Sequence, residues 1–182
     1  MTVLHCSQKL LKRLRRPASL PAPAPSTNPL GEWYADIDFI DRQPFVLMMN
    51  AATGLVLVLP GRAEYLKRLH LCAAEQLASL LQACGIEGPL AEAELDAWQQ
   101  PATYARTSNR SMVASINQRK MDAWTHFAYH GHSAFEVALR MLETPFTRKD
   151  LGRDYHLAPD LVRARLLPSA KILPFRIAST RH

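Results

Sequence analysis

The densest group of side chains suited to chemistry lies in the segment RTSNRSMVASIN, residues 106–117. The N-terminus of a helix presents free N–H groups and a partial positive charge, so arginines beside it can complete a site for phosphate or carboxylate. The sequence therefore predicts a ligand- or partner-binding site, with Trp33 facing it, formed by Arg106, Asn109, Arg110, Ser111 and Asn117. The alternative is structural, because Ser, Thr and Asn are also the residues that cap helices.

Three histidines follow in the pattern HxxxHxH, at His126, His130 and His132. The first two are four residues apart and share one face of a helix, as metal-binding histidines often do. No glutamate follows the first histidine as in HExxH, and aromatic residues separate the three. Surface histidines on an aromatic-rich helix are the alternative, so we expect no metal or cofactor and keep the three only as candidate ligands.

Asp36 and Asp38 form the third group, because alternate residues of a strand point to the same side. Paired carboxylates suit acid–base or magnesium chemistry. Exposed acidic residues on a one-sided sheet explain them equally well.

The sequence does not contain the patterns of the common enzyme classes. GxGxxG, GxxxxGK[ST], GxSxG and CxxC are all missing, and seven glycines leave little material for phosphate-cradling loops. We therefore expect a protein without catalytic residues, although this does not exclude an enzyme.

Positive charge is concentrated at the two ends of the sequence. Of the net charge of +6, residues 1–20 contribute +5 and residues 151–182 contribute +4, whereas residues 21–150 contribute −3. Basic segments of this kind meet phosphates or acidic protein surfaces, or keep a protein in solution. The contact residues that we predict are Lys9, Lys12, Arg13, Arg15 and Arg16.

Cysteine use and hydropathy bear on the compartment. Three cysteines without CxxC spacing favour reduced thiols, and no apolar stretch reaches the roughly 20 residues of a membrane span. We expect a cytoplasmic protein that does not enter a membrane. A mitochondrial transit peptide is the alternative for the basic first 31 residues.

The elements that position these groups follow from the apolar periodicity. Strands are expected at 2–6, 32–40, 44–50, 54–60 and 102–107, and helices at 8–16, 63–83, 90–99, 108–130 and 133–143. This order predicts an α+β fold in which a small antiparallel sheet is covered by several helices around a single core. Residues 1–150 would form the domain, with a proline-rich loop at 17–30, and residues 151–182 a basic C-terminal extension.

Four segments resemble an uncharacterised bacterial family of small proteins, a domain of unknown function. They are VLHCSQKLLKRL, LGEWYADIDFI, RTSNRSMVASIN and LETP, and the family motifs read LxCTxKLLKRL, GDWYA, TxNRSxxGSMND and ETPC. The resemblance spans residues 2–146 and implies no known activity or cofactor. Glu32, Gln118 and Phe146 stand where the motifs have Asp, Asp and Cys, which favours a binding or structural role for these motifs.

The function expected from these observations is a noncatalytic binding module whose basic ends contact nucleic acid or an acidic protein. The alternative is a small-ligand-binding protein or enzyme with an anion site around Arg110 and Asn117. In a third hypothesis, the amphipathic helix at 8–16 docks on a partner protein through its leucines.

Overall fold

The computed structural model describes residues 1–17, 19–147, 152 and 154–167. The strands are β1 (Val3–Cys6), β2 (Trp33–Ile40), β3 (Gln43–Asn50), β4 (Val56–Pro60) and β5 (Thr103–Arg106). The helices are α1 (Gln8–Arg13), α2 (Ala63–Leu66), α3 (Leu69–Ala83), α4 (Pro89–Gln99), α5 (Arg110–His130), α6 (Ala134–Leu142) and α7 (Ala158–Leu166).

The five strands form one sheet in the order β4-β3-β2-β1-β5. The α+β class is confirmed, and β2, β3 and β4 form the expected antiparallel meander. The sheet is mixed rather than wholly antiparallel, because β1 pairs in parallel with both β2 and β5. Parallel neighbours need a crossover connection. The segment from α1 through the proline-rich loop is long enough to return the chain to the start of β2.

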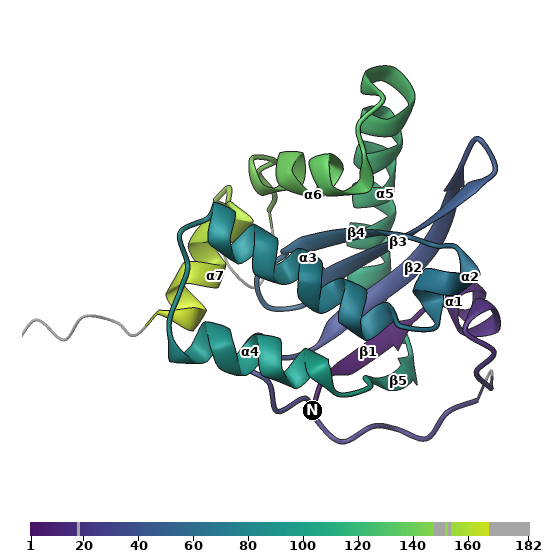
Figure 1. Ribbon diagram of the computed structural model, residues 1–182, viewed down its shortest axis with the longest axis horizontal. Coiled ribbons are helices and arrows are strands. Elements are labelled where there is room, and N and C mark those ends of the chain that lie inside the picture. The colour runs from purple at the N-terminus through teal and green to yellow at the C-terminus, as the bar shows by residue number, and fades with distance from the viewer. Residues whose placement is uncertain (18, 148–151, 153, 168–182) are drawn as a thin grey trace, which may run out of the picture.

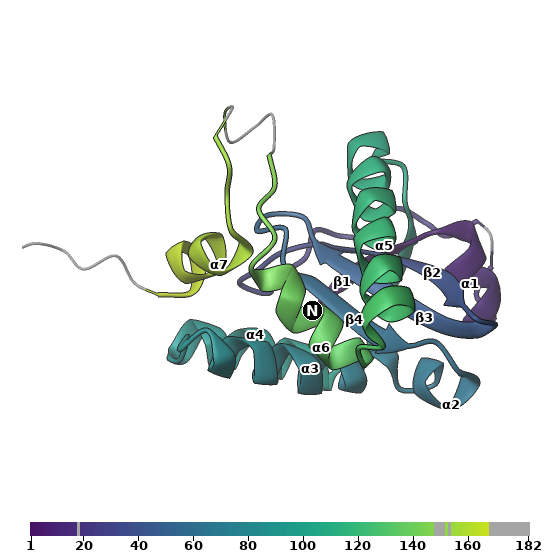
Figure 2. The same cartoon turned by 90° about the horizontal axis from the view of Figure 1, so that it is seen from above.

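Helices cover both faces of this sheet and one of its edges (Figures 1 and 2). Figure 2 shows α3 and α4 on one side of the sheet and α5 on the other, while α6 packs beside the edge strand β4. Gln76 of α3 bonds the outer backbone edge of β4. Its side chain accepts from the N–H of Val58 and donates to the C=O of the same residue, both at 2.7 Å. In the described ranges, no helix combines the length and apolarity of a membrane span.

Local sequence signals fix the helix ends. Ser7 caps α1, and Asn109 caps α5. Ser133 and Glu136 form a reciprocal capping box at the start of α6. Gly131 ends α5 in the left-handed conformation, with φ of 64°, which glycine adopts without steric cost.

Two helices differ from the expected ranges. The predicted helix at 63–83 is divided into α2 and α3, because Arg68 leaves the helical conformation with φ of −124° and ψ of 35°. The predicted helix at 8–16 ends at Arg13, and Arg15 follows in the left-handed region with φ of 55°. Arg15 and Arg16 therefore lie just beyond α1.

Apolar residues from all five strands and from the helices between them form one core cluster. The segment at 158–166, which the sequence analysis assigned to a basic extension, forms α7 and places Ala158, Val162 and Leu166 in this cluster. Residues 168–182 of the predicted extension lie outside the described residues.

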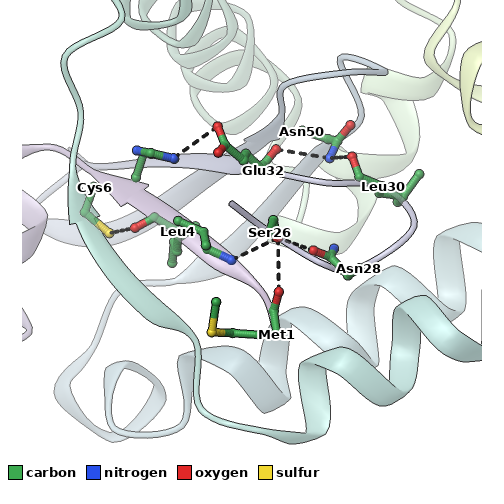
Figure 3. A network of polar contacts seen from close by, with 10 residues as sticks. Met1, Leu4, Cys6, Ser26, Asn28, Leu30, Glu32 and Asn50 are labelled. Carbon is green, nitrogen blue, oxygen red and sulfur yellow. Dashed lines mark hydrogen bonds and ion pairs between the residues drawn. The ribbon is translucent and has the colours of Figure 1, made fainter. Parts of the chain in front are cut away.

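Polar contacts attach the proline-rich loop to the core (Figure 3). Ser26 bonds Asn28 and the carbonyl of Met1 (3.1 Å), and the Asn50 amide donates to the carbonyls of Leu30 (3.1 Å) and Glu32 (3.3 Å). On α4, the completely buried Glu94 accepts bonds from Asn28 Nδ2 (2.7 Å), the Leu30 N–H (2.7 Å) and Trp98 Nε1 (3.0 Å). The end of this loop is therefore a fixed part of the domain.

Candidate functional site

The polar cluster predicted at residues 106–117 surrounds the start of α5. The Asn109 side chain accepts bonds from the N–H groups of Ser111 (3.0 Å) and Met112 (3.2 Å), which is the capping role. The remaining predicted side chains are exposed, and these are Arg106, Arg110, Ser111 and Asn117. The structure thus places five of the six predicted residues on α5, at its N-cap or on the strand before it.

Trp33, the sixth predicted residue, does not reach this surface. Its side chain is fully buried and meets the edge of Trp98, with ring centroids 5.6 Å apart. Its neighbour Tyr34 points to the opposite face, where its ring stacks on His5 with the centroids 4.6 Å apart. The alternation of side chains along β2 explains this separation.

Asp36 and Asp38 do share one side of β2, as their spacing indicates, and both face α5. Lys120 Nζ lies 2.6 Å from Asp36 Oδ2 and 3.2 Å from Asp38 Oδ2, and Ser7 Oγ donates to Asp36. Burial lowers the pKa of Lys120, but the two carboxylates outweigh it and leave the pKa above its usual value. One lysine thus bridges the paired acids, which suits a structural link between α5 and the sheet.

A cavity of about 370 Å³ opens between α5 and the segment after α6. One wall comes from α5, the base from Met49 at the end of β3, and the opposite wall from residues 144–147 together with Tyr155. The lining residues are Met49, Ser115, Gln118, Arg119, Asp122, Thr144, Pro145, Phe146, Thr147 and Tyr155. Segments far apart in the sequence thus meet around one mixed polar and apolar space.

Arg119 is the buried charge of this cavity, with 5% of its surface exposed. Its Nη1 lies 3.3 Å from Asp122 Oδ2, and its Nη2 donates to the Thr144 carbonyl at 3.4 Å. Burial lowers the pKa of Arg119, and the Asp122 carboxylate opposes this change. A guanidinium has five N–H donors, of which these contacts use two, so donors remain for a bound molecule.

Phe146 is fixed on two sides. Its backbone forms a bridge with His156, with N···O distances of 3.0 and 2.8 Å. Its ring lies so close to Gly54 that a Cβ on that residue would be 2.5 Å from the ring. The ring therefore has little freedom to leave the cavity.

Sequence reasoning missed Arg119 and this cavity, although a signal was present. The two late positions at which the sequence departs from the motifs described above, Gln118 and Phe146, both line it. The resemblance had drawn attention to these positions separately. Only the fold shows that they face one space.

Comparison with known proteins now adds to this geometry. Residues 3–159 match the family described as Domain of unknown function (DUF6933). The chain belongs to this family. No curated protein matches the sequence. The resemblance to an uncharacterised family is thereby confirmed, and the matched range of DUF6933 includes every residue that lines the cavity.

The basic helix of this DUF6933 chain leaves its charges exposed and its leucines buried. Lys9, Lys12, Arg13, Arg15 and Arg16 are all exposed, and in the described part of the chain none of them pairs with an acidic side chain. Leu10 and Leu11 belong to the core, so the apolar face of α1 is not available for docking on a partner.

A second hollow, of about 270 Å³, is lined by Arg13, Leu14, Arg15, Ala63, Leu66 and Lys67. Of these described lining residues, three are cations and none is an acid. Figure 1 shows α1 and α2 next to each other at this end of the DUF6933 domain. We call the surface formed by Lys9, Lys12, Arg13, Arg15, Arg16 and Lys67 the α1–α2 basic surface.

The cysteines of this DUF6933 chain are free, and none lines either hollow. Burial raises the pKa of the Cys6 thiol far above its usual value, and the nearby Asp36 adds to this effect. Because the thiolate is the reactive form, Cys6 acts as a small buried core residue.

Proposed function

We propose that the protein is a noncatalytic binding module whose α5 cavity holds a small ligand with a flat apolar part and a carboxylate. One observation carries the proposal: Arg119, almost completely buried, stands in the wall of a cavity with N–H donors to spare. An arginine fork matches a carboxylate in shape as well as in charge.

The lining supports the apolar part of this ligand. Met49, Pro145 and Phe146 offer apolar surface, and Thr147 offers a hydroxyl, whereas the Thr144 hydroxyl donates to the Arg140 carbonyl at 3.1 Å. The volume of about 370 Å³ lies at the low end of the range of about 300–1,000 Å³ that ligand pockets span. This space is large enough for a ligand of one or two rings.

The absence of an activated group in the lining supports binding without chemistry. Among the residues that the structure describes, no histidine or cysteine lines the cavity. The Ser115 hydroxyl donates to the Ser111 carbonyl at 3.1 Å, and Asp122 is held by Arg119. A nucleophile needs an adjacent base, and this lining supplies no such pair.

A thermal-shift series tests the proposal with paired probes. We would compare benzoate and indole-3-carboxylate with their neutral amides, on the wild-type chain, on Arg119→Gln, and on Arg140→Gln as the matched control. Arg140 is exposed on α6 and pairs with Glu143 outside this cavity. We expect stabilisation by the acids that Arg140→Gln keeps and Arg119→Gln loses. Equal stabilisation of all three proteins would contradict the proposal, as would the lack of any.

A second function, binding of a polyanion such as nucleic acid, is supported by the α1–α2 basic surface. Three of its cations, Arg13, Arg15 and Lys67, line a hollow in which none of the described lining residues is acidic. Lysine and arginine contacts to phosphates release counterions, so such binding weakens steeply with salt and needs no sequence motif. An acidic protein partner would meet the same surface by the same electrostatics.

Salt-dependent binding to single-stranded and duplex DNA and RNA tests this second function. The variant Lys9→Gln/Lys12→Gln/Arg15→Gln removes three charges from the surface, and Arg42→Gln/Arg140→Gln/Arg163→Gln removes three exposed charges elsewhere. We expect the first variant alone to lose most of the affinity and of the salt dependence. Equal losses in both variants would show that only net charge matters, and absence of binding at low salt would end the idea.

A further inference from the structure

The three histidines of the HxxxHxH pattern meet at the C-terminal end of α5. His126 and His130 lie one helical turn apart. Gly131 then reverses the chain in the left-handed conformation, and the N–H of His132 points back to the carbonyl of His126 at 3.4 Å. The turn therefore returns the third histidine to the first two.

The rings form a nearly equilateral triangle. Their centroids are separated by 5.7 Å for His126 and His130, and by 5.4 Å from His132 to each of the other two. Nitrogens turned toward the middle of this triangle would be about 3.5 Å apart, close to the roughly 3.4 Å between two ligands that lie about 2.0–2.1 Å from one tetrahedral ion. The spacing of the three rings suits a single ion.

Two of the ring nitrogens lack a partner. The Nδ1 atoms of His126 and His132 are shielded from solvent and form no hydrogen bond within the described residues. A buried polar atom without a partner is costly, by about 1–3 kcal/mol. A bound metal ion would satisfy both nitrogens, as would a proton or a water molecule bound in its place.

The rings must turn before they can bind. As they stand, no three His, Cys, Asp or Glu side chains in the described ranges are arranged to hold a metal ion. The χ2 torsion of histidine is broad, so turning the rings in place costs little. His132 also borders a hollow of about 350 Å³, which leaves room for a water as the fourth ligand. Glu136 and Glu143 line the same hollow, and their negative charges offset the positive charge of Arg140 there.

We propose that His126, His130 and His132 bind one divalent transition-metal ion of the zinc class. The ion fastens the last turn of α5 to the start of α6, because His132 directly precedes the capping box of Ser133 and Glu136. This site is separate from the α5 cavity, and the inference does not depend on the proposed ligand.

Calorimetric titration of the tag-free full chain with Zn²⁺ alone tests the proposal. We expect one ion per chain, and each of the variants His126→Gln, His130→Gln and His132→Gln should weaken binding more than about tenfold. His70→Gln on α3 is the control and should bind as the wild type does. Absence of binding, or equal binding by the wild type and all three variants, would overturn the proposal.

A second measurement does not depend on the variants. Long-range ¹H–¹⁵N spectra of the histidine rings follow each imidazole during the Zn²⁺ titration. Shifts confined to the three cluster histidines are the expected result. Zn²⁺ binding that leaves these rings unchanged would place the ion elsewhere and overturn the proposal.

Discussion

The guanidinium of Arg119 lies 5.6 Å from the centre of the Phe146 ring. The buried charge of the α5 cavity therefore contacts the aromatic ring that lines the same cavity. The same guanidinium donates to the Thr144 carbonyl, and the Phe146 backbone is bridged to His156. Arg119 thus joins α5 to the segment of Thr144 and Phe146, which is bridged in turn to the segment of His156.

The first prediction concerns the support of this aromatic ring. Gly54→Ala should displace Phe146, because the new Cβ would lie 2.5 Å from the ring. Gly85 has a similar positive φ, 62° against 69°, but open space around it. Gly85→Ala should therefore cost only the backbone strain of about 1 kcal/mol, and Gly54→Ala about 1–2 kcal/mol more, by chemical denaturation.

The same pair of variants also bears on the ligand. Gly54→Ala should weaken binding of aromatic acids, whereas Gly85→Ala should not. Equal destabilisation of the two proteins with unchanged binding would show that Phe146 does not depend on its contact with Gly54.

The second prediction concerns Glu94 and pH. Burial raises the pKa of Glu94, and the bonds from Leu30, Asn28 and Trp98 only partly oppose this. Between the ordinary value of 4.5 and the raised value, the folded state binds more protons than the unfolded state, so stability falls as pH rises through this interval. Glu94→Gln should remove this part of the slope in denaturation curves from pH 4 upward, at about the acidity where unfolded glutamates titrate.

Glu94→Gln should also cost about 1–3 kcal/mol, because its NH₂ group would face buried donors. An unchanged slope of stability against pH would show that Glu94 titrates normally.

The third prediction concerns the ion pair beneath α5. Lys120→Met leaves Asp36 and Asp38 together without their cation and should cost about 3 kcal/mol or more. The pKa of Lys120 is raised above 10.5, so its stabilisation is complete below that pH and is lost as pH rises through the raised value.

Asp36 and Asp38 provide an internal comparison. Asp36 is the more buried, with 14% of its side chain exposed against 38% for Asp38. Asp36→Asn should therefore destabilise clearly, and Asp38→Asn by no more than about 1 kcal/mol. A larger loss for Asp38→Asn would indicate that the network is centred on the outer carboxylate.

Much of the fold could be predicted because local signals decide it. The caps at Ser7 and Asn109, the alternation of β2 and the near-continuous apolar runs of β3 and β4 are visible in the sequence and agree with the structure. The parallel pairing of β1 with β2 could not be predicted from the sequence, because it depends on the path by which the proline-rich loop leads the chain to the start of β2. The break between α2 and α3 at Arg68 could not be predicted either, because no proline or glycine marks it in the sequence.

The candidate site was harder to predict than the fold. Residue types favour the polar cluster at the start of α5, whereas Arg119 lies further along the same helix and its sequence context is that of a surface charge. Its burial comes from Thr144 and Phe146, more than 20 residues away. The histidine triangle could be anticipated because its three members lie within seven residues.

The NMR signal of the Arg119 side chain shows whether this residue binds a carboxylate in the α5 cavity. We would follow the Arg119 Nε–Hε signal, assigned through its disappearance in Arg119→Lys, during titration with indole-3-carboxylate and then with the matching amide. If Arg119 binds the carboxylate, this signal shifts saturably with the acid and changes little with the amide. An Arg119 signal that stays in place while the acid binds would contradict the account.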